Sequence, residues 1–344
     1  MTQKRLKSGR LLDSNGVLTE AGYATSLVKD YSRDDIKAPR LRIKEWDYYF
    51  IGNDHYGVAM TIADNSYMGF VGCTFFDFDN KNYKTKNFMT FMPKGKTNMP
   101  STSKTGDVFF KNKKIDIQFF NDGSKRHLLC QIPKFDKNKE ILVDVLLTDE
   151  PEDSMVIATP FGKGKYEKYF YYNQKINCLR ASGTVKYDDK EYVFNPEDSF
   201  AVLDWGRGVW PYKNTWYWSS MSGLHEGVRV GFNLGYGFGD TSNASENMIF
   251  YDGKAYKLDQ VKFNIPIKNG KEDYLSTWTI ESNDDKLNLT FEPIIDRHSS
   301  DNVLIISSAQ HQVFGCFSGT LRVEDKTLEI KNLLGFAEKV SNRW

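Results

Sequence analysis

Short apolar or alternating runs, joined by turn residues, follow one another along most of this chain. Residues 248–251 and 255–258 are separated by Asp-Gly-Lys, and residues 278–281 and 286–291 are separated by a turn that contains Asn-Asp-Asp. Asp, Asn and Gly accept the positive φ angles that tight hairpin loops require. Because such pairs recur throughout, the sequence predicts an all-β fold of antiparallel barrels or curved sandwiches, and disfavours a parallel α/β sheet.

The length of the chain leaves room for two such units. At roughly 150 residues per domain, 344 residues are enough for two separate cores. The best candidate for a helix is residues 19–29, where Thr19 is a suitable cap. We expect an N-terminal arm over residues 1–36, a first β domain over residues 37–180 and a second over residues 181–344.

Composition bears on partners and compartment. The 46 basic and 45 acidic side chains give a formal charge of +1, so we do not expect a nucleic-acid partner. The chain shows neither a secretory leader nor a run of about 18 apolar residues. Its four single cysteines, without a CxxC pair, are typical of a reducing compartment. We therefore expect a cytoplasmic protein with no transmembrane segment, no metal ion and no bound cofactor.

The densest aromatic cluster lies at residues 205–218, which hold four of the seven tryptophans. Asp204 and Arg207 are interspersed with these rings, a composition typical of a pocket that is apolar with a few fixed polar groups. Burial beside indoles would raise the pKa of Asp204 and make it a proton donor. The alternative is an ion pair between Asp204 and Arg207 that only orders the glycine-rich loop.

The tryptophans divide into two groups by their positions. Trp205 and Trp210 flank glycines and are the better candidates for ligand contact, whereas Trp216 and Trp218 share one strand face and are expected in the core. The same pocket hypothesis includes Arg207 and a further set of polar and aromatic side chains, namely Tyr212, Asn233, Tyr236, Glu246, Asn247 and Gln310.

Three further features of the sequence are candidates for a site. Glycines at positions 235, 237 and 239 leave one strand face bare, which indicates close approach by a ring, a ligand or another backbone. His311 is a candidate acid or base, although a single histidine in a strand is also a common core residue. Asp240, Glu246 and Asn247 carry oxygen ligands, but their spacing fits no calcium loop.

Several strings in the chain resemble one bacterial family. They are DWGRGVWP at 204–211, GFNLGYGFGDTS at 231–242, QHQVFG at 310–315 and GFAEKVSNRW at 335–344. Together with the opening LLDSNG they span nearly the whole chain, and they resemble the family called domain of unknown function 2804. The name of that family implies no activity.

A fainter likeness extends to the carotenoid 1,2-hydratase group. GTV at 183–185, the Asp204-Trp205 pair, Trp216-x-Trp218 and Glu338 are similar to features of that group. The resemblance implies two lipocalin-like antiparallel barrels and chemistry on an alkene, such as addition of water or cyclisation. It would place Asp204 as the acid, although Gly206-Arg207-Gly208 replaces the continuation found in that group.

These observations lead to three hypotheses. The first is binding of an apolar or amphipathic small molecule, with Asp204 protonating an alkene and Trp205 or Tyr236 facing the cation as hydratase, isomerase or cyclase. The second is carbohydrate recognition by exposed tryptophans. The third is a structural role, in which the indoles fill the seam between two barrels and bind nothing.

Overall fold

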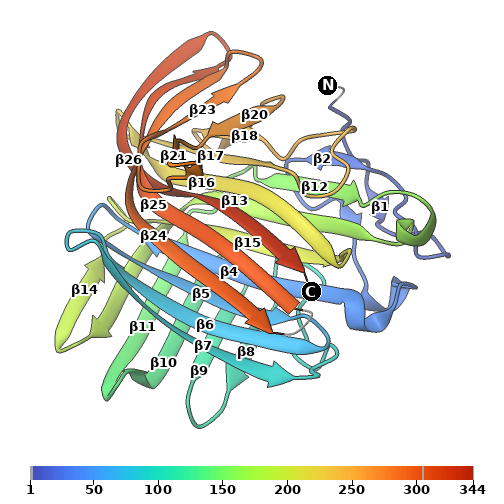
Figure 1. The fold of residues 1–344 in the computed structure, drawn as a ribbon, viewed down its shortest axis with the longest axis horizontal. Helices are drawn as coiled ribbons and strands as arrows, with labels where there is room; N and C mark the ends of the chain where they lie inside the picture. Colours follow the sequence, from blue (N-terminus) through green and yellow to red (C-terminus); the bar gives the residue numbers. More distant parts are fainter. Residues whose placement is uncertain (1–2, 304–305, 344) are drawn as a thin grey trace.

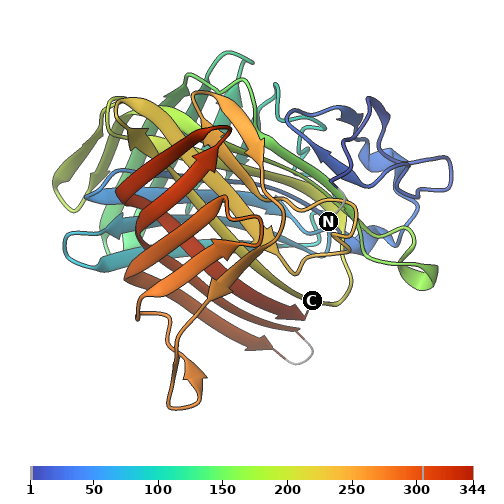
Figure 2. The same ribbon diagram turned by 90° about the horizontal axis from the view of Figure 1, so that it is seen from above.

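Two large antiparallel sheets form the molecule. This computed structural model describes residues 3–303 and 306–343. Within those residues it contains no α-helix, only strands and the short 3₁₀ turns η1 (Arg33–Asp35), η2 (Arg40–Arg42) and η3 (Gly164–Tyr166). In Figure 1 the orange and red strands of the second sheet lie beside the blue strands of the first, and Figure 2 shows how both sheets curl.

The first sheet has 13 strands. Its hydrogen-bonded order is β7 (Asn82–Phe91), β6 (Met68–Asp77), β5 (Tyr56–Asp64), β4 (Ile43–Gly52), β15 (Phe200–Val209), β13 (Phe170–Tyr187), β11 (Lys139–Thr148), β10 (Arg126–Asp136), β9 (Asp116–Asn121) and β8 (Val108–Lys111). Off this path, β13 also pairs with β12 (Met155–Pro160) and β14 (Lys190–Phe194), and β12 pairs with β2 (Gly22–Ala24).

The second sheet has nine strands. Its order is β19 (Lys254–Lys257), β18 (Met248–Tyr251), β17 (Val228–Tyr236), β16 (Lys213–His225), β26 (Lys326–Arg343), β25 (Ile306–Val323), β24 (Leu287–Val303), β23 (Trp278–Ser282) and β20 (Val261–Asn264). Two small sheets complete the fold, a parallel pair β1 (Gly9–Arg10) with β3 (Lys29–Asp30) and a hairpin of β21 (Ile267–Lys268) with β22 (Lys271–Glu272).

Strands at the contact between the sheets, such as β4 and β15, are buried on both faces, whereas outlying strands such as β11 and β23 alternate buried and exposed residues. Because successive side chains of a strand point to opposite faces, one face of each sheet encloses its own apolar core and the other packs against the neighbouring sheet. Ile176 and Leu203 belong to the core of the first sheet, and Phe232 and Phe317 belong to the core of the second. The contact between the sheets is a separate set of buried aromatic and apolar residues that includes Phe336.

The all-β prediction is confirmed, and so is the expected pair of curled, lipocalin-like sheets. The predicted hairpins form, including β18 with β19 and β23 with β24. The helix expected at residues 19–29 is wrong, because Gly22–Ala24 pairs with β12 and this strand pairing overrides the local helical pattern. No helix among the described residues is long and apolar enough to span a membrane.

The chain passes from the first sheet to the second at a point other than residue 180, where the sequence analysis placed the domain boundary. β13 runs through that position, and both β14 and β15 belong to the first sheet. The second sheet begins with β16, so the chain crosses from one sheet to the other between Val209 and Lys213. Residues 3–36 pack as an arm along the first sheet, where β2 extends β12.

Candidate functional site

A buried polar cluster lies where the two sheets face each other. On β15, Asp204 points toward the second sheet, whereas Trp205 points into the core of the first sheet. On β13, Lys175 is paired in register with Asp204 and lies on the same face. Lys175 and Asp204, with Glu246 and Glu338 from the second half of the chain, are called the inter-sheet cluster below.

Lys175 and Asp204 form the centre of this cluster. The Lys175 Nζ lies 3.1 Å from Oδ2 of Asp204 and 3.8 Å from the ring centroid of Trp218. Asn173 donates from Nδ2 to Oδ1 of Asp204 at 2.6 Å. Asp204 is therefore held as an acceptor by two neighbours, and the ammonium group is placed between a carboxylate and an indole face.

Glu338 accepts hydrogen bonds at both oxygens of its carboxyl group. Its Oε1 accepts from Nε1 of Trp216 at 2.9 Å, and its Oε2 accepts from Nε2 of Gln312 at 3.2 Å. Burial raises the pKa of Glu338 to about 7, while the bond from Trp216 and the charge of Lys175 act in the opposite direction and Asp204 adds to the rise. A carboxyl with a pKa near neutrality can both give and take a proton.

Glu246 approaches the cluster from the chain segment before β18. Asn233 donates from Nδ2 to Oε2 of Glu246 at 3.2 Å, and Trp218 donates from Nε1 to Oδ1 of Asn233 at 2.8 Å. Burial raises the pKa of Glu246, and Lys175 opposes this rise. A Cβ atom at Gly235 would collide with the Glu246 carboxyl group. The bare face predicted around Gly235 is therefore occupied by an acid.

Interlocked rings close one end of the seam. Trp46 is stacked on Tyr171 with centroids 6.0 Å apart and meets Trp210 edge-on at 5.1 Å. Trp210 in turn contacts Trp216 and Phe238, at 6.0 and 4.8 Å. Trp210 is 6% exposed, so its indole is used in packing rather than displayed to solvent.

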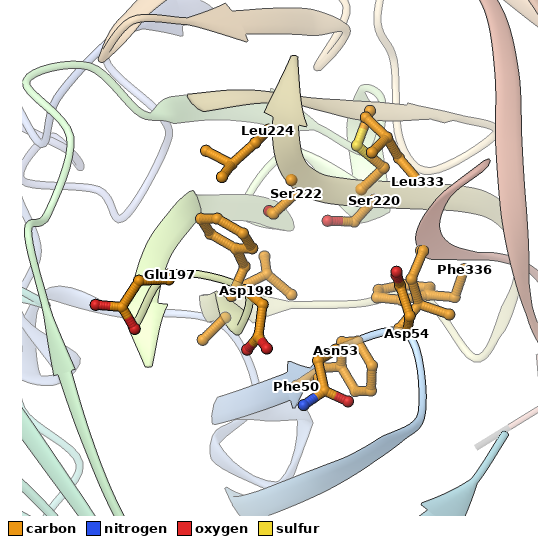
Figure 3. Close-up of a pocket in the computed structure, with 18 residues that line it drawn as sticks. Phe50, Asn53, Asp54, Glu197, Asp198, Ser220, Ser222, Leu224, Leu333 and Phe336 are labelled. Carbon is orange, nitrogen blue, oxygen red and sulfur yellow. The ribbon is translucent and has the colours of Figure 1, made fainter. Parts of the chain in front are cut away.

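The other end of the seam contains a pocket of about 210 Å³ between β4, β15, β16 and β26 (Figure 3). Its apolar lining includes Phe50, Leu224, Leu333 and Phe336, and its polar lining includes Ser220 and two loops with Asp54, Glu197 and Asp198. Phe336 meets Trp218 edge-on at 4.8 Å. The pocket wall is therefore in contact with the ring that covers Lys175.

Arg207 and Trp205 lie on the other side of β15. The Arg207 guanidinium donates to Asp47 Oδ1 at 3.0 Å, to the Trp46 carbonyl at 2.8 Å and to the Pro100 carbonyl at 2.8 Å. Its guanidinium carbon lies 4.3 Å from the Trp205 ring centroid. The expected ion pair of Asp204 with Arg207 is thus wrong, because a three-residue separation in a strand places the two side chains on opposite faces.

The remaining sequence candidates fall into two groups. Asn233, Glu246 and Gln310 reach the inter-sheet cluster, Gln310 through a 3.4 Å bond to Glu338 Oε2. Asn247 instead accepts from the Gly235 N–H and donates to the Asp259 carbonyl, which fixes the loop before β18.

The other three candidates lie away from the cluster. Tyr236 stacks on Tyr217 at the rim of the second core. Tyr212 is 39% exposed, with the Arg42 guanidinium over its ring. His311 is on the opposite face of β25 from Gln312, where its Nδ1 is 2.7 Å from Asp296 Oδ2. Tyr274 stacks on the imidazole.

Sequence reasoning did not single out Lys175 or Gln312. Lys175 lies in Asn173-Gln174-Lys175-Ile176-Asn177, a mostly polar run that is typical of a strand that faces solvent. Its burial becomes visible only once the second sheet covers that face. Within the described residues, no group of three or more His, Cys, Asp or Glu side chains is placed to hold a metal ion.

Fold and site together define an all-β protein of two curled sheets with a buried acidic cluster between them. The chain belongs to the family described as domain of unknown function DUF2804, whose model matches residues 2–344. This confirms the family recognised from the sequence strings. No curated protein sequence matches the chain.

The chain also matches solved structures along most of its length. An AttH-like protein from Nitrosomonas europaea is 12% identical, with a TM-score of 0.57 over 90% of this chain and 96% of that chain. At this identity the likeness shows the fold alone. Kievitone hydratase from Nectria haematococca is 10% identical, with a TM-score of 0.48 over 99% and 98% of the two chains. CghA with Sch210972 is 8% identical, with a TM-score of 0.44 over 98% and 97%.

Proposed function

We propose that the protein binds an apolar or amphipathic small molecule between its two sheets and protonates an alkene of that molecule. The observation that carries this proposal is Glu338, a buried carboxyl with a pKa of about 7 among indole rings. Water, a neighbouring C–H bond or a second alkene can then complete a hydration, an isomerisation or a cyclisation.

The two acids have different environments and therefore different roles. Asp204 is paired with Lys175 and accepts from Asn173, so its carboxylate oxygens are held as acceptors. Among residues 3–303 and 306–343, Glu338 forms no ion pair of this kind, which makes it the better proton donor.

The proton can be accounted for at each step. Glu338 gives its proton to one alkene carbon, and the positive charge develops on the other carbon. In this proposal the Trp218 ring and the Asp204 carboxylate, which hold the Lys175 ammonium, also stabilise that charge. Attack by water or loss of a C–H proton then discharges the cation. Attack by a second alkene instead closes a ring and moves the positive charge to a new carbon, which then loses a C–H proton or captures water. The proton released in that step returns to the Glu338 carboxylate.

Ligand recovery is the first test. The protein is exposed to a total lipid extract and examined by native mass spectrometry, and we expect one retained class of molecule. The retained ligand is then incubated with the protein in D₂O, where protonation at carbon introduces deuterium. Glu338→Gln should slow this incorporation by about 10²-fold or more, while affinity stays within about threefold.

Two further variants make this test specific. Glu329→Gln changes an exposed carboxyl on the same strand and should leave the rate unchanged. Asp204→Asn should also slow deuterium incorporation, because the developing cation loses its counter-charge. Full turnover by a folded Glu338→Gln variant would refute Glu338 as the acid.

A structural role for the tryptophan cluster also has one observation in its favour. Trp46, Trp210 and Trp216 interlock and fill one end of the seam. If this role were the whole function, no small molecule would be retained from the extract. In that case Leu333→Trp, which fills the pocket, would raise or preserve the midpoint of unfolding without changing any ligand signal.

A further inference from the structure

The pocket between the sheets has two chemically different sides. Phe50, Leu334 and Phe336 line it on the side that continues into the seam. Asp54, Glu197 and Asp198 border it from two loops (Figure 3), and these three are called the mouth carboxylates below. All three side chains are exposed, so they lie where the pocket opens to water.

No basic side chain balances these acids in the pocket. None of the 18 lining residues is a lysine, an arginine or a histidine. Within residues 3–303 and 306–343, no ion pair to a mouth carboxylate is formed, and the partner of Asp198 is the hydroxyl of Ser199. Desolvation raises the pKa of Asp54, the neighbouring His55 opposes this rise, and Asp198 adds to it. His55 itself pairs with Asp79 outside the pocket.

The apolar side of the pocket leads toward the acid of the proposed reaction. Phe336 and Glu338 are two residues apart on β26, so they share a face and their Cα atoms are separated by about 7 Å. Phe336 contacts the ring of Trp218, and Glu338 accepts a hydrogen bond from Trp216 on the same strand. A molecule whose apolar part lies against Phe336 therefore directs that part toward the inter-sheet cluster.

We propose that the ligand of this pocket is an amphipathic molecule whose polar end carries a positive charge. The inference rests on the function proposed above and adds the charge and the orientation of the substrate. The cationic end lies at the mouth carboxylates, and the apolar end points past Phe50 and Phe336 toward Glu338. A neutral end would gain no attraction from the three carboxylates, and an anionic end would be repelled by them.

Three probes of equal chain length test the charge preference. Octylamine, octan-1-ol and octanoate are titrated into the protein by isothermal calorimetry at pH 7 and at low ionic strength. We expect octylamine to bind about tenfold more tightly than octan-1-ol and octanoate to bind least. Added salt should reduce the advantage of octylamine, because exposed charges are screened over about 8–10 Å at physiological ionic strength.

Matched variants then locate the effect. The triple variant Asp54→Asn, Glu197→Gln and Asp198→Asn should lose the roughly tenfold preference for octylamine and keep its affinity for octan-1-ol. A control triple variant, Asp189→Asn, Glu324→Gln and Asp325→Asn, removes three exposed hairpin-turn carboxylates outside the pocket. It should bind all three probes as the wild type does.

The outcomes separate this inference from the proposed function. Equal binding of the three probes, or an octylamine preference that survives the mouth substitutions, would overturn the cationic ligand and leave small-molecule binding intact. Absence of binding by all three probes, together with no ligand retained from the lipid extract, would overturn both.

Discussion

Lys175 and Asp204, both on the first sheet, form an ion pair in the seam where the second sheet covers them. The Nζ atom lies 3.1 Å from Oδ2, and the two side chains are only 3% and 11% exposed. The pair joins neighbouring strands β13 and β15, at positions in direct register. Removing two charges from water is costly, so such a pair persists only where each charge has further partners. Here Asn173 supplies one to the acid and the Trp218 ring supplies one to the ammonium.

The first prediction concerns the loss of the ammonium group. Lys175→Met leaves Asp204, Glu246 and Glu338 buried without their nearest cation. We expect the free energy of unfolding to fall by about 3–5 kcal/mol, measured by urea denaturation at pH 7. The double variant Lys175→Met with Asp204→Leu should recover part of this loss, because the uncompensated charge is removed as well.

An exposed ion pair provides the control. Lys139 and Asp188 lie 2.6 Å apart, but their side chains are 48% and 45% exposed. Lys139→Met should therefore change the free energy of unfolding by less than about 1 kcal/mol. A Lys175→Met variant as stable as Lys139→Met would contradict a buried pair at the centre of the seam.

The second prediction is a pH dependence that arises from Glu338. The folded pKa of about 7 lies above the reference value of 4.5, so the folded protein holds this proton more tightly than the unfolded chain does. The resulting stabilisation is complete below about pH 4.5 and is lost as the pH rises through 7. At 1.36 kcal/mol per unit, the loss is about 3 kcal/mol.

Glu338→Gln removes this titration without removing the side-chain volume. The difference in unfolding free energy between wild type and variant should therefore fall by about 3 kcal/mol between pH 4 and pH 8. Urea titrations at four pH values in that range measure it. A difference that is constant with pH would mean that Glu338 has an ordinary pKa in the folded protein.

Hairpins were readable from the sequence because their information is local. The turn residues between β18 and β19, or between β23 and β24, determine both the pairing and the side of each strand. The helix expected at residues 19–29 is wrong for the opposite reason. The strand conformation of Gly22–Ala24 depends on pairing with β12, which is distant in the sequence. The crossing between sheets likewise depends on the pairing of β15 with β4, which are about 150 residues apart in the sequence.

The site was predictable only where composition gave a local signal. Asp204 was found through the neighbouring tryptophans, but its partner Lys175 looked like a solvent-facing residue. Arg207 was assigned to the site because residues 204–208 were interpreted as a loop. As a strand, the same residues place Asp204 and Arg207 on opposite faces, a distinction that period-two alternation supplies once the strand is known.

The third prediction tests the structural role of Arg207. Its guanidinium is fully buried and donates to Asp47 and to the backbone carbonyls of Trp46 on β4, Gly206 on β15 and Pro100. Lysine cannot reproduce this planar set of donors. We expect Arg207→Lys to lower the free energy of unfolding by about 3 kcal/mol, while octylamine affinity of the folded protein stays unchanged. A stable variant with weakened octylamine binding would instead place Arg207 in the ligand site.

The fourth prediction concerns the close approach of Trp46 to the backbone of β15. A Cβ atom at Gly206 would overlap the six-membered ring of Trp46, so Gly206→Ala forces the indole or the strand to move. We expect a loss of about 3 kcal/mol in unfolding free energy, at the upper end of the usual cost of overpacking. Gly223→Ala is the control, because the nearest atom to its Cβ would be a Leu333 methyl group at 3.2 Å, and its effect should stay within about 1 kcal/mol.

The double variant Gly206→Ala with Trp46→Leu should cost less than the sum of the two single changes, because removing the ring creates the space that the new methyl group needs. Additive losses in that cycle, measured by urea denaturation, would show that the Trp46 ring does not lie over Gly206.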